Sequence, residues 1–325
     1  MDHEENNELA ERLLQGDRVA LARAISLVEN GSPRAEALLD RLYSKTGRAF
    51  RVGVTGPPGA GKSTLVGRLA VKQWERGLWV GVVAVDPSSP FTRGALLGDR
   101  IRFQDVPSDP RIFVRSMASR GSPGGLAYRT GEACDLVDAF GMDLILVETV
   151  GVGQSELDVA AAVHTTVVVL VPESGDEVQA MKAGLMEIGD IFAVNKADRE
   201  GAARITRGLQ DMLKLRPPSP DGWSPPVLPL SALRGEGVDG LIESIERHRD
   251  HLAARGALGA LKRERAEQRI RELIGAELGD RFWRRPGALP TLREGLERID
   301  SGHSSPYREA ELLLNSTNID EGTGR

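Results

Sequence analysis

The residues with the clearest chemical potential form a glycine-rich stretch that ends in a lysine and two hydroxyls. Gly56-Pro57-Pro58-Gly59-Ala60-Gly61-Lys62-Ser63-Thr64 fits the pattern G-x-x-x-x-G-K-[ST] of phosphate-binding loops. Its glycines let backbone N–H groups turn toward phosphate oxygens, and a following helix would add the partial positive charge of its N-terminus. We expect all nine residues to contact a nucleotide, with Lys62 at the β- and γ-phosphates and the Ser63 hydroxyl on Mg²⁺.

A second polar motif predicts which base is bound. Asn195-Lys196-Ala197-Asp198 fits the N-K-x-D element of guanine-binding proteins. The Asp198 carboxylate can accept from both guanine N1–H and the 2-amino group, whereas adenine would leave a buried carboxylate unpaired. Asn195 and Lys196 should brace the loop and cover the base, and Ser231-Ala232-Leu233 should supply a backbone contact to guanine O6. The three elements together predict GTP and GDP as ligands.

Acidic residues at the ends of expected strands predict a magnesium site and a switch. Glu148-Thr149-Val150-Gly151 fits [DE]-x-x-G, in which the acid holds a water of the Mg²⁺ shell and the Gly151 N–H senses the γ-phosphate. Asp86 and Asp99 could also face the metal or the attacking water, although an Asp-Pro turn and a helix cap are the competing interpretations. The expected metal residues are Ser63, Asp86, Asp99 and Glu148, and the expected catalytic residues are Lys62, Asp99 and Glu148.

The sequence assigns no residue to orient the attacking water. GTP hydrolysis depends largely on positioning and electrostatics, and a glutamine often places the water. No glutamine directly follows Gly151, and Gln154 stands three residues beyond it. We therefore expect slow intrinsic turnover that a partner accelerates.

The elements that must position these residues alternate between β-branched runs and helical patterns. This alternation predicts βαβ units and a mostly parallel sheet covered by helices, an α/β fold of the P-loop GTPase class. Apolar residues at helical spacing predict an N-terminal helical cap over 1–48, a GTPase domain over 49–245 and a C-terminal helical arm over 246–325. The expected strands are Val52 to Thr55, Val80 to Val85, Leu144 to Val147, Thr166 to Val171, Ile191 to Val194 and Val227 to Leu230.

Composition excludes several kinds of partner. The 325 residues include 42 Lys and Arg against 47 Asp and Glu, and the net charge of −5 gives no basic field for nucleic acid or an anionic membrane. The start of the chain has no signal-peptide pattern, and the longest apolar stretch, Val159 to Val171, is too short to span a bilayer. A single cysteine, Cys134, fits a reducing compartment, so we expect a cytoplasmic protein.

The C-terminal arm carries more apolar positions than a terminal appendage needs to bury. We expect it to build a homodimer, although the same side chains could instead fold back on the chain's own GTPase domain. Its basic run from Lys262 to Arg271 is interleaved with glutamates, which favours a solvated helix face over a nucleic-acid site.

The sequence around the motifs resembles that of one family, the methylmalonyl-CoA mutase-associated GTPases of the MeaB/ArgK type. The resemblance covers nearly the whole chain and extends well beyond the short nucleotide motifs. The matching pieces are Gly16-Asp17, Ala20 to Ser26, the P-loop, Val85 to Pro90, Leu97 to Arg100, Glu148 to Glu156, Gly175 to Glu177, Gln179 to Gly184 and Asn195 to Asp198.

The resemblance implies a homodimeric chaperone that uses GTP to gate adenosylcobalamin delivery to an acyl-CoA mutase and to protect or reactivate that enzyme, with the adenosyltransferase as a second partner. By the same likeness Lys62, Asp86, Asp99 and Glu148 are nucleotide and magnesium residues. Pro172 to Lys182 would form an additional partner-sensing switch, in which Glu173 departs from the glycine that the family commonly has.

Two other functions remain as alternatives. A transport-system kinase is a label attached to some relatives, and it would require phosphotransfer to a protein. Nickel-inserting GTPases share the fold, but five scattered histidines and one cysteine do not provide the soft-ligand site of a nickel carrier.

Overall fold

A computed structural model describes residues 2–86, 103, 105–118, 125–149, 160–172, 184–217, 219 and 221–316. The chain divides into two compact units, residues 1–265 and residues 266–325. The helix α10 (Val238–Ala254) runs across position 246 within the first unit. The domain limits 48/49 and 245/246 stay a prediction of the sequence pattern.

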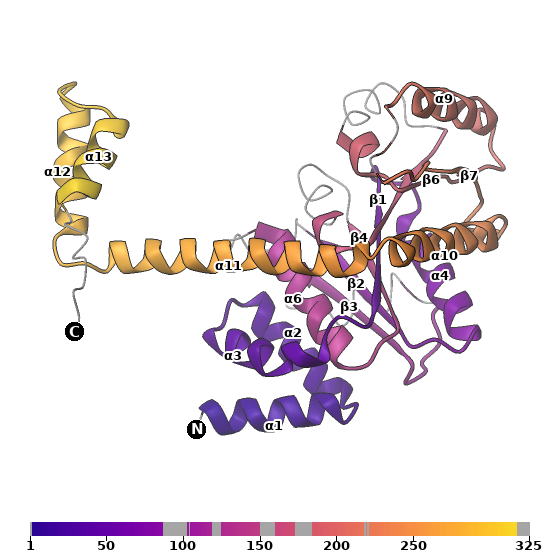
Figure 1. Cartoon of the computed structure of the whole chain (residues 1–325), viewed down its shortest axis with the longest axis horizontal. Coiled ribbons are helices and arrows are strands. Elements are labelled where there is room, and N and C mark those ends of the chain that lie inside the picture. The colour runs from indigo at the N-terminus through magenta and orange to yellow at the C-terminus, as the bar shows by residue number, and fades with distance from the viewer. Residues whose placement is uncertain are drawn as a thin grey trace. The chain divides into compact units, whose positions relative to one another are not determined.

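The first unit is built on one parallel sheet of seven strands, in the order β3-β2-β4-β1-β5-β6-β7 (Figure 1). All of its strand pairs are parallel. Each strand predicted from the sequence is present within one to two residues at either end, because buried Val, Ile and Leu dominate these runs. The strands are β1 (Phe50–Thr55), β2 (Val80–Asp86), β3 (Ile112–Ala118), β4 (Leu144–Thr149), β5 (Thr165–Leu170), β6 (Ile191–Val194) and β7 (Val227–Pro229).

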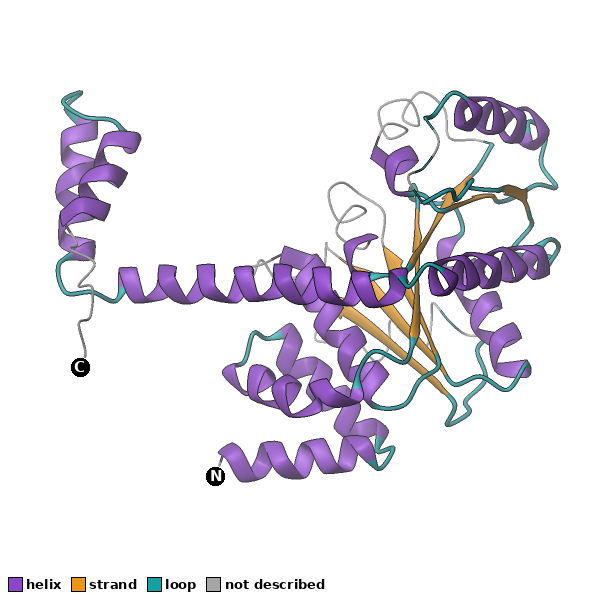
Figure 2. Ribbon diagram, viewed as in Figure 1, coloured by secondary structure: helices purple, strands orange, loops and turns teal. Residues whose placement is uncertain are grey.

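Helices cover both faces of this sheet, as Figure 2 shows in purple around the orange strands. Val82 and Leu146 pack with α4 (Lys62–Glu75) and α10, whereas the adjacent residues Val83 and Val147 pack with α6 (Gly125–Ala139). Alternate residues of a strand point to opposite faces, so the two helix layers lie on opposite sides. A third cluster joins α9 (Ala202–Lys214) to β6 and β7. This arrangement confirms the predicted α/β fold.

The N-terminal helices pack on the α6 side of the sheet. They are α1 (Asp2–Leu14), α2 (Arg18–Glu29), α3 (Pro33–Leu42) and a 3-10 turn (Tyr43–Lys45). The apolar run that begins at Leu9 is divided into two helices, because Gly16 turns the chain at φ +85° and the Asp17 carboxylate caps α2 by accepting from the Val19 and Ala20 N–H groups.

A buried polar network fastens the segment that leads into β1. The Asp138 carboxylate of α6 accepts from the backbone N–H groups of residues 47, 48 and 49 at 2.7, 3.2 and 3.1 Å. The buried Arg51 guanidinium pairs with Asp135 at 2.6 Å and with Asp138 at 3.4 Å. Arg265, near the start of α11 (Ala257–Trp283), donates to Ala161 O at 3.0 Å and contacts His164 Nε2 at 3.1 Å. The network holds the end of the sheet at which β1 begins, opposite the carboxyl ends of the strands.

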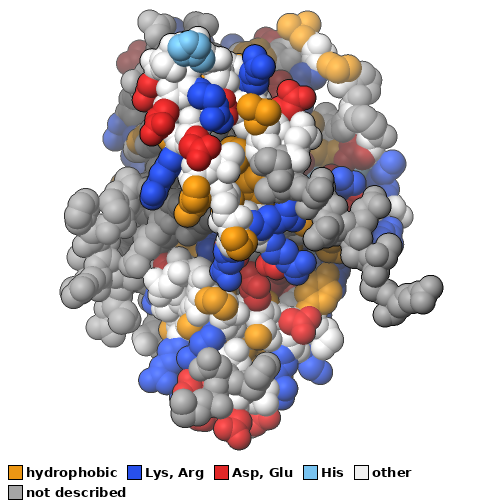
Figure 3. All heavy atoms as spheres, turned by 90° about the vertical axis from the view of Figure 1, so that its left-hand side faces the viewer, with side chains coloured by type: hydrophobic (Ala, Val, Ile, Leu, Met, Phe, Trp, Pro, Cys, Tyr) orange, Lys and Arg blue, Asp and Glu red, His pale blue; other side chains and the backbone are white. Residues whose placement is uncertain are grey.

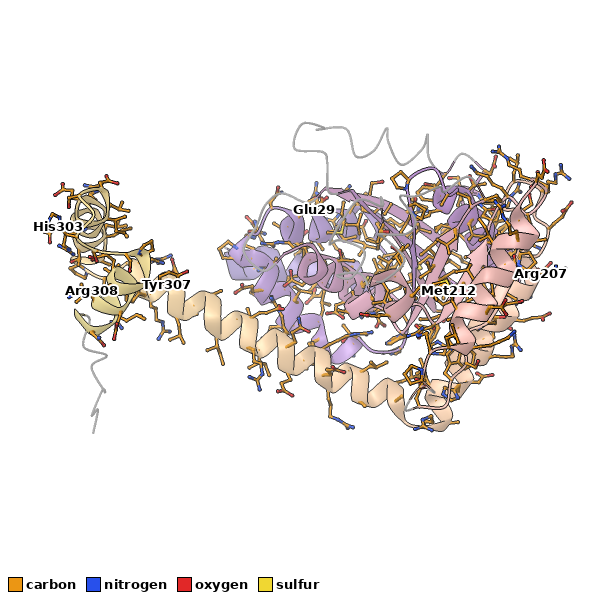
Figure 4. All side chains as sticks on the ribbon, turned by 90° about the horizontal axis from the view of Figure 1, so that it is seen from above. Glu29, Arg207, Met212, His303, Tyr307 and Arg308 are labelled. Carbon is orange, nitrogen blue, oxygen red and sulfur yellow. The ribbon has the colours of Figure 1, made fainter. Side chains whose placement is uncertain are left out.

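The second unit contains the remainder of α11, α12 (Ala288–Asp300) and α13 (Pro306–Ser316). Arg298 and Glu309 form an ion pair at 2.7 Å between α12 and α13. Tyr307 is 88% exposed and stands out from α13 (Figure 4). Hydrophobic and charged side chains are interspersed on the face shown in Figure 3. The large apolar side chains exposed in this unit are Ile270, Leu273, Ile274, Leu278, Trp283, Leu289, Leu296, Tyr307, Leu312 and Leu314.

None of the helices in the described ranges combines the length and the apolar character that a membrane span requires.

Candidate nucleotide-binding site

The glycine-rich loop connects the end of β1 to the start of α4, as its sequence context predicts. Two of its glycines are required by close approaches. A Cβ on Gly56 would lie 2.1 Å from Val169 O, and a Cβ on Gly61 would lie 2.4 Å from Asn195 Nδ2. Both residues also have positive φ, +137° and +83°, which side-chain-bearing residues rarely adopt. The loop is therefore held against β5 and the Asn195 side chain, with the N-terminus of α4 directly behind it.

Lys62 is the first residue of α4 and is only 6% exposed. Its ammonium group donates to Gly56 O at 2.6 Å and to Pro57 O at 3.0 Å. The charge is thus held inside the curve of the loop, among the backbone groups that the motif uses for phosphate. This is the placement expected for a lysine that binds β- and γ-phosphates.

Ser63 and Glu148 come together from distant parts of the chain. Ser63 Oγ donates to Glu148 Oε1 at 2.5 Å, and Glu148, on β4, is 1% exposed. A hydroxyl and a carboxylate are hard oxygen ligands of the kind that Mg²⁺ prefers, so this pair fits the ion. Asp86 is the last residue of β2, which lies beside β4, but its side chain is outside the described residues. Asp99 and Gly151 also lie outside them.

Asn195 joins the three nucleotide motifs. Its Nδ2 donates to Ala60 O in the glycine-rich loop at 2.7 Å, and its Oδ1 accepts from Lys196 N at 2.8 Å and from Ala232 N at 2.9 Å. The side chain is 3% exposed. Lys196 has φ +56°, and among the described residues other than glycine it alone has a positive φ. A single amide thus holds together loops that are separated by up to 172 positions in the sequence, from Ala60 to Ala232.

Asp198 lies at the rim of this assembly, and its side chain is 25% exposed. The hydrogen bond from the Ser231 side chain, the backbone N–H of Asp198 and the nearby Arg234 charge hold the pKa of the Asp198 carboxyl below its ordinary value. The carboxylate is therefore an ionised acceptor at neutral pH, which is the state needed to pair with two N–H donors. Leu233 O accepts from Arg68 of α4 at 3.3 Å, and the Leu233 side chain is 77% exposed.

The structure adds two features that the motifs did not predict. One is the bond from Asn195 to Ala60, which links base-side and phosphate-side loops. The other is the ion pair between Arg234 and Asp198 at 3.4 Å. Arg234 directly follows Ser231-Ala232-Leu233, and this position next to a nucleotide motif could have drawn attention to it. Its residue type could not, because an arginine in a polar turn is common.

Comparison with known proteins connects this site to one family. The family model described as "Methylmalonyl Co-A mutase-associated GTPase MeaB" matches residues 21–287. A protein of Pyrococcus horikoshii whose name describes it as a GTPase is 46% identical over 310 residues, covering 95% of this chain and 97% of that protein.

Two further proteins are similar over most of their length. The "Methylmalonic aciduria type A homolog, mitochondrial" of Mus musculus is 35% identical over 93% of this chain and 77% of that protein. A solved structure described as "LAO/AO transport system kinase" superposes with a TM-score of 0.71 at 29% identity, covering 96% of this chain and 97% of that one.

Proposed function

The chain belongs to the methylmalonyl-CoA mutase-associated GTPase family, and from this premise we propose that it is a chaperone for an acyl-CoA mutase of the methylmalonyl-CoA mutase type. The chain is a GTPase, which converts GTP to GDP and phosphate. The proposed cellular role is to gate adenosylcobalamin delivery to the mutase and to protect or reactivate that enzyme, with its adenosyltransferase as a second partner. Its support is the family match over residues 21–287 and the likeness to the mouse protein.

The observation that carries the nucleotide chemistry is the meeting of three motifs at Asn195. Lys62 would place positive charge at the β- and γ-phosphates, and Asp198 would accept from the guanine edge. Ser63 and Glu148, with Asp86 and Asp99, are the proposed residues of the Mg²⁺ site, where the ion would neutralise charge on the phosphates. Gly151 is the proposed sensor of the γ-phosphate, Pro172 to Lys182 the proposed partner-sensing switch, and Ser231, Ala232 and Leu233 the proposed contact to guanine O6.

The assignment of Asp198 to base recognition predicts a change of specificity. Asp198→Asn should weaken GTP binding and favour xanthosine triphosphate, because an amide can donate to the xanthine carbonyl. A competition assay with both nucleotides measures the change. An unaltered preference for GTP would reject the assignment.

The assignment of Lys62 to the phosphates predicts a loss of nucleotide affinity or turnover in Lys62→Ala. Its ammonium donates to two loop carbonyls, and the sheet core is held by apolar packing, so the fold should persist. Circular dichroism separates the two cases, since global unfolding of the variant would make Lys62 a structural residue.

The partner is tested by capture from the native cell with the protein loaded with GTP or with GDP. The proposal predicts that an adenosylcobalamin-dependent acyl-CoA mutase is recovered and that the amount differs between the two nucleotides. The transport-system kinase alternative predicts transfer of the γ-phosphate of labelled GTP to a co-purifying protein, which the chaperone role does not.

We also propose a homodimer built by the C-terminal arm. Its support is the number of exposed apolar side chains on α11, α12 and α13, because a single chain would leave these side chains in water. Light scattering on the full chain should give twice the mass of one chain. Ile274→Glu with Leu278→Glu should give monomers, whereas Gln268→Lys, an exposed control on the same helix, should not. If the wild-type protein were monomeric, the proposal that the C-terminal arm builds a homodimer would be rejected.

We place this protein in the cytoplasm and expect neither nucleic acid nor a membrane as partner. The supports are the net charge of −5 and the single cysteine, Cys134, which is buried among apolar residues of the first unit. Fluorescence microscopy of a tagged chain in its native cell tests the location.

A further inference from the structure

The turn that follows β7 holds one arginine in a fixed place beside the base-side loop. Ser231 N donates to Glu236 O at 2.9 Å, and the two residues form an antiparallel bridge that closes the turn. Gly235 and Gly237 both have φ +76°, and a Cβ on Gly237 would lie 2.7 Å from Pro229 O. Because the backbone is fixed on both sides of Arg234, its side chain leaves the turn from a defined position.

A second contact anchors the middle of this turn. Arg68 of α4 donates to Leu233 O at 3.3 Å, directly before Arg234. Ala232 N, on the other side of Leu233, donates to Asn195 Oδ1 at 2.9 Å. The turn is therefore tied both to the helix that follows the phosphate loop and to the loop that carries Asp198.

From this turn the Arg234 guanidinium reaches Asp198. Its Nη2 lies 3.4 Å from Asp198 Oδ2, and the two side chains are 58% and 25% exposed. Ser231 also hydrogen-bonds to the Asp198 carboxylate. The Arg234 charge and the Ser231 side chain, both from one turn, thus restrict the rotation of this carboxylate about its Cβ–Cγ bond. Guanine presents N1–H and its 2-amino group in one plane, so a carboxylate held in a single orientation loses less freedom on pairing with them.

We propose that Arg234 is a positioning residue for guanine, which orients the Asp198 carboxylate toward the N1–H and 2-amino donors of the base. This inference rests on the proposed role of Asp198 in base recognition. Arg234 acts through Asp198, and it is not a catalytic residue. A planar guanidinium suits this task better than an ammonium, because it directs its N–H groups at a carboxylate in a fixed geometry.

The test is calorimetric binding of GDP, inosine diphosphate and xanthosine diphosphate to the full chain. Arg234→Ala should weaken GDP about 2- to 5-fold, the range of exposed ion pairs, and added salt should reduce that difference. The loss should be smaller for inosine diphosphate, which lacks the 2-amino group. Arg234→Lys should recover part of the GDP affinity. Arg207→Ala, an exposed arginine on α9 labelled in Figure 4, is the matched control and should change nothing.

A double variant separates this inference from the function on which it rests. In Asp198→Asn the charge that Arg234 orients is gone, so adding Arg234→Ala should leave xanthosine diphosphate binding unchanged. The role of Arg234 would be overturned if Arg234→Ala lowered nucleotide affinity equally in wild type and in Asp198→Asn. It would also be overturned if Arg234→Ala left GDP affinity unchanged. If wild type does not prefer GDP over ADP, or Asp198→Asn does not favour xanthosine diphosphate, the proposed guanine site fails instead. Arg234→Gln, which keeps a long polar side chain without charge, repeats the comparison if the alanine variant unfolds.

Discussion

Replacing Asn195 by alanine tests whether one amide holds the nucleotide site together. The change removes one donated and two accepted hydrogen bonds, to Ala60 O, Lys196 N and Ala232 N, in a place that is 3% exposed. At roughly 1 kcal/mol for each bond, about 3 kcal/mol is lost in total. Expressed wholly in binding, that is roughly a 150-fold weaker Kd for GDP. We expect the loss to divide between the free energy of unfolding and the free energy of GDP binding.

Two measurements show how the lost free energy divides between folding and GDP binding. Urea denaturation gives the free energy of unfolding, and calorimetry gives the Kd for GDP. Asn195→Thr keeps a hydroxyl that can accept one backbone N–H, so it should fall between wild type and Asn195→Ala in both. If Asn195→Ala matched wild type in both measurements, the convergence at Asn195 would not support the site. Reduced stability with an unchanged Kd would mean that the amide braces the fold and not the nucleotide loops.

Three further outcomes follow from the structure. Asp138→Ala should lower the free energy of unfolding by about 3–5 kcal/mol, because its buried carboxylate accepts three backbone N–H groups and pairs with Arg51; a loss under about 1 kcal/mol in urea denaturation would contradict this. Ser63→Ala should raise the Mg²⁺ concentration needed for half-maximal GTP turnover, and an unchanged Mg²⁺ requirement would remove Ser63 from the metal site. Burial raises the pKa of Asp190 to about 7 from 3.8, so its stabilising contribution is full below pH 3.8 and is lost as pH rises through 7. In urea denaturation, Asp190→Asn should therefore be more stable than wild type above pH 7 and approach wild type below pH 4. A stability difference independent of pH would refute the raised pKa of Asp190.

Local patterns determined much of the fold. Six strands were predictable because each is a short run of mainly β-branched and apolar residues, and the sheet buries five of these runs on both faces. The edge strand β3 was missed, since Arg115 and Ser116 interrupt its apolar run. Helical spacing over 1–48 did not show that the chain turns at Gly16, because a glycine within such spacing does not by itself show a positive φ.

The sequence by itself determined the chemistry of the nucleotide site. A phosphate loop and an N-K-x-D element are each contiguous, so their residue types and spacing are visible without a fold. The helix expected after the glycine-rich loop is present as α4, because the glycines before it and the apolar spacing within it are local signals.

Only the tertiary structure decided how these motifs meet. Ser63 and Glu148 are 85 positions apart, and the bond between them depends on β1 and β4 being neighbours in the sheet. The bond from Asn195 to Ala60 spans 135 positions, and the pairing of Arg234 with Asp198 depends on a closed turn. Contacts of this kind arise from strand order and from the packing of distant segments, and no periodicity within a single segment encodes them.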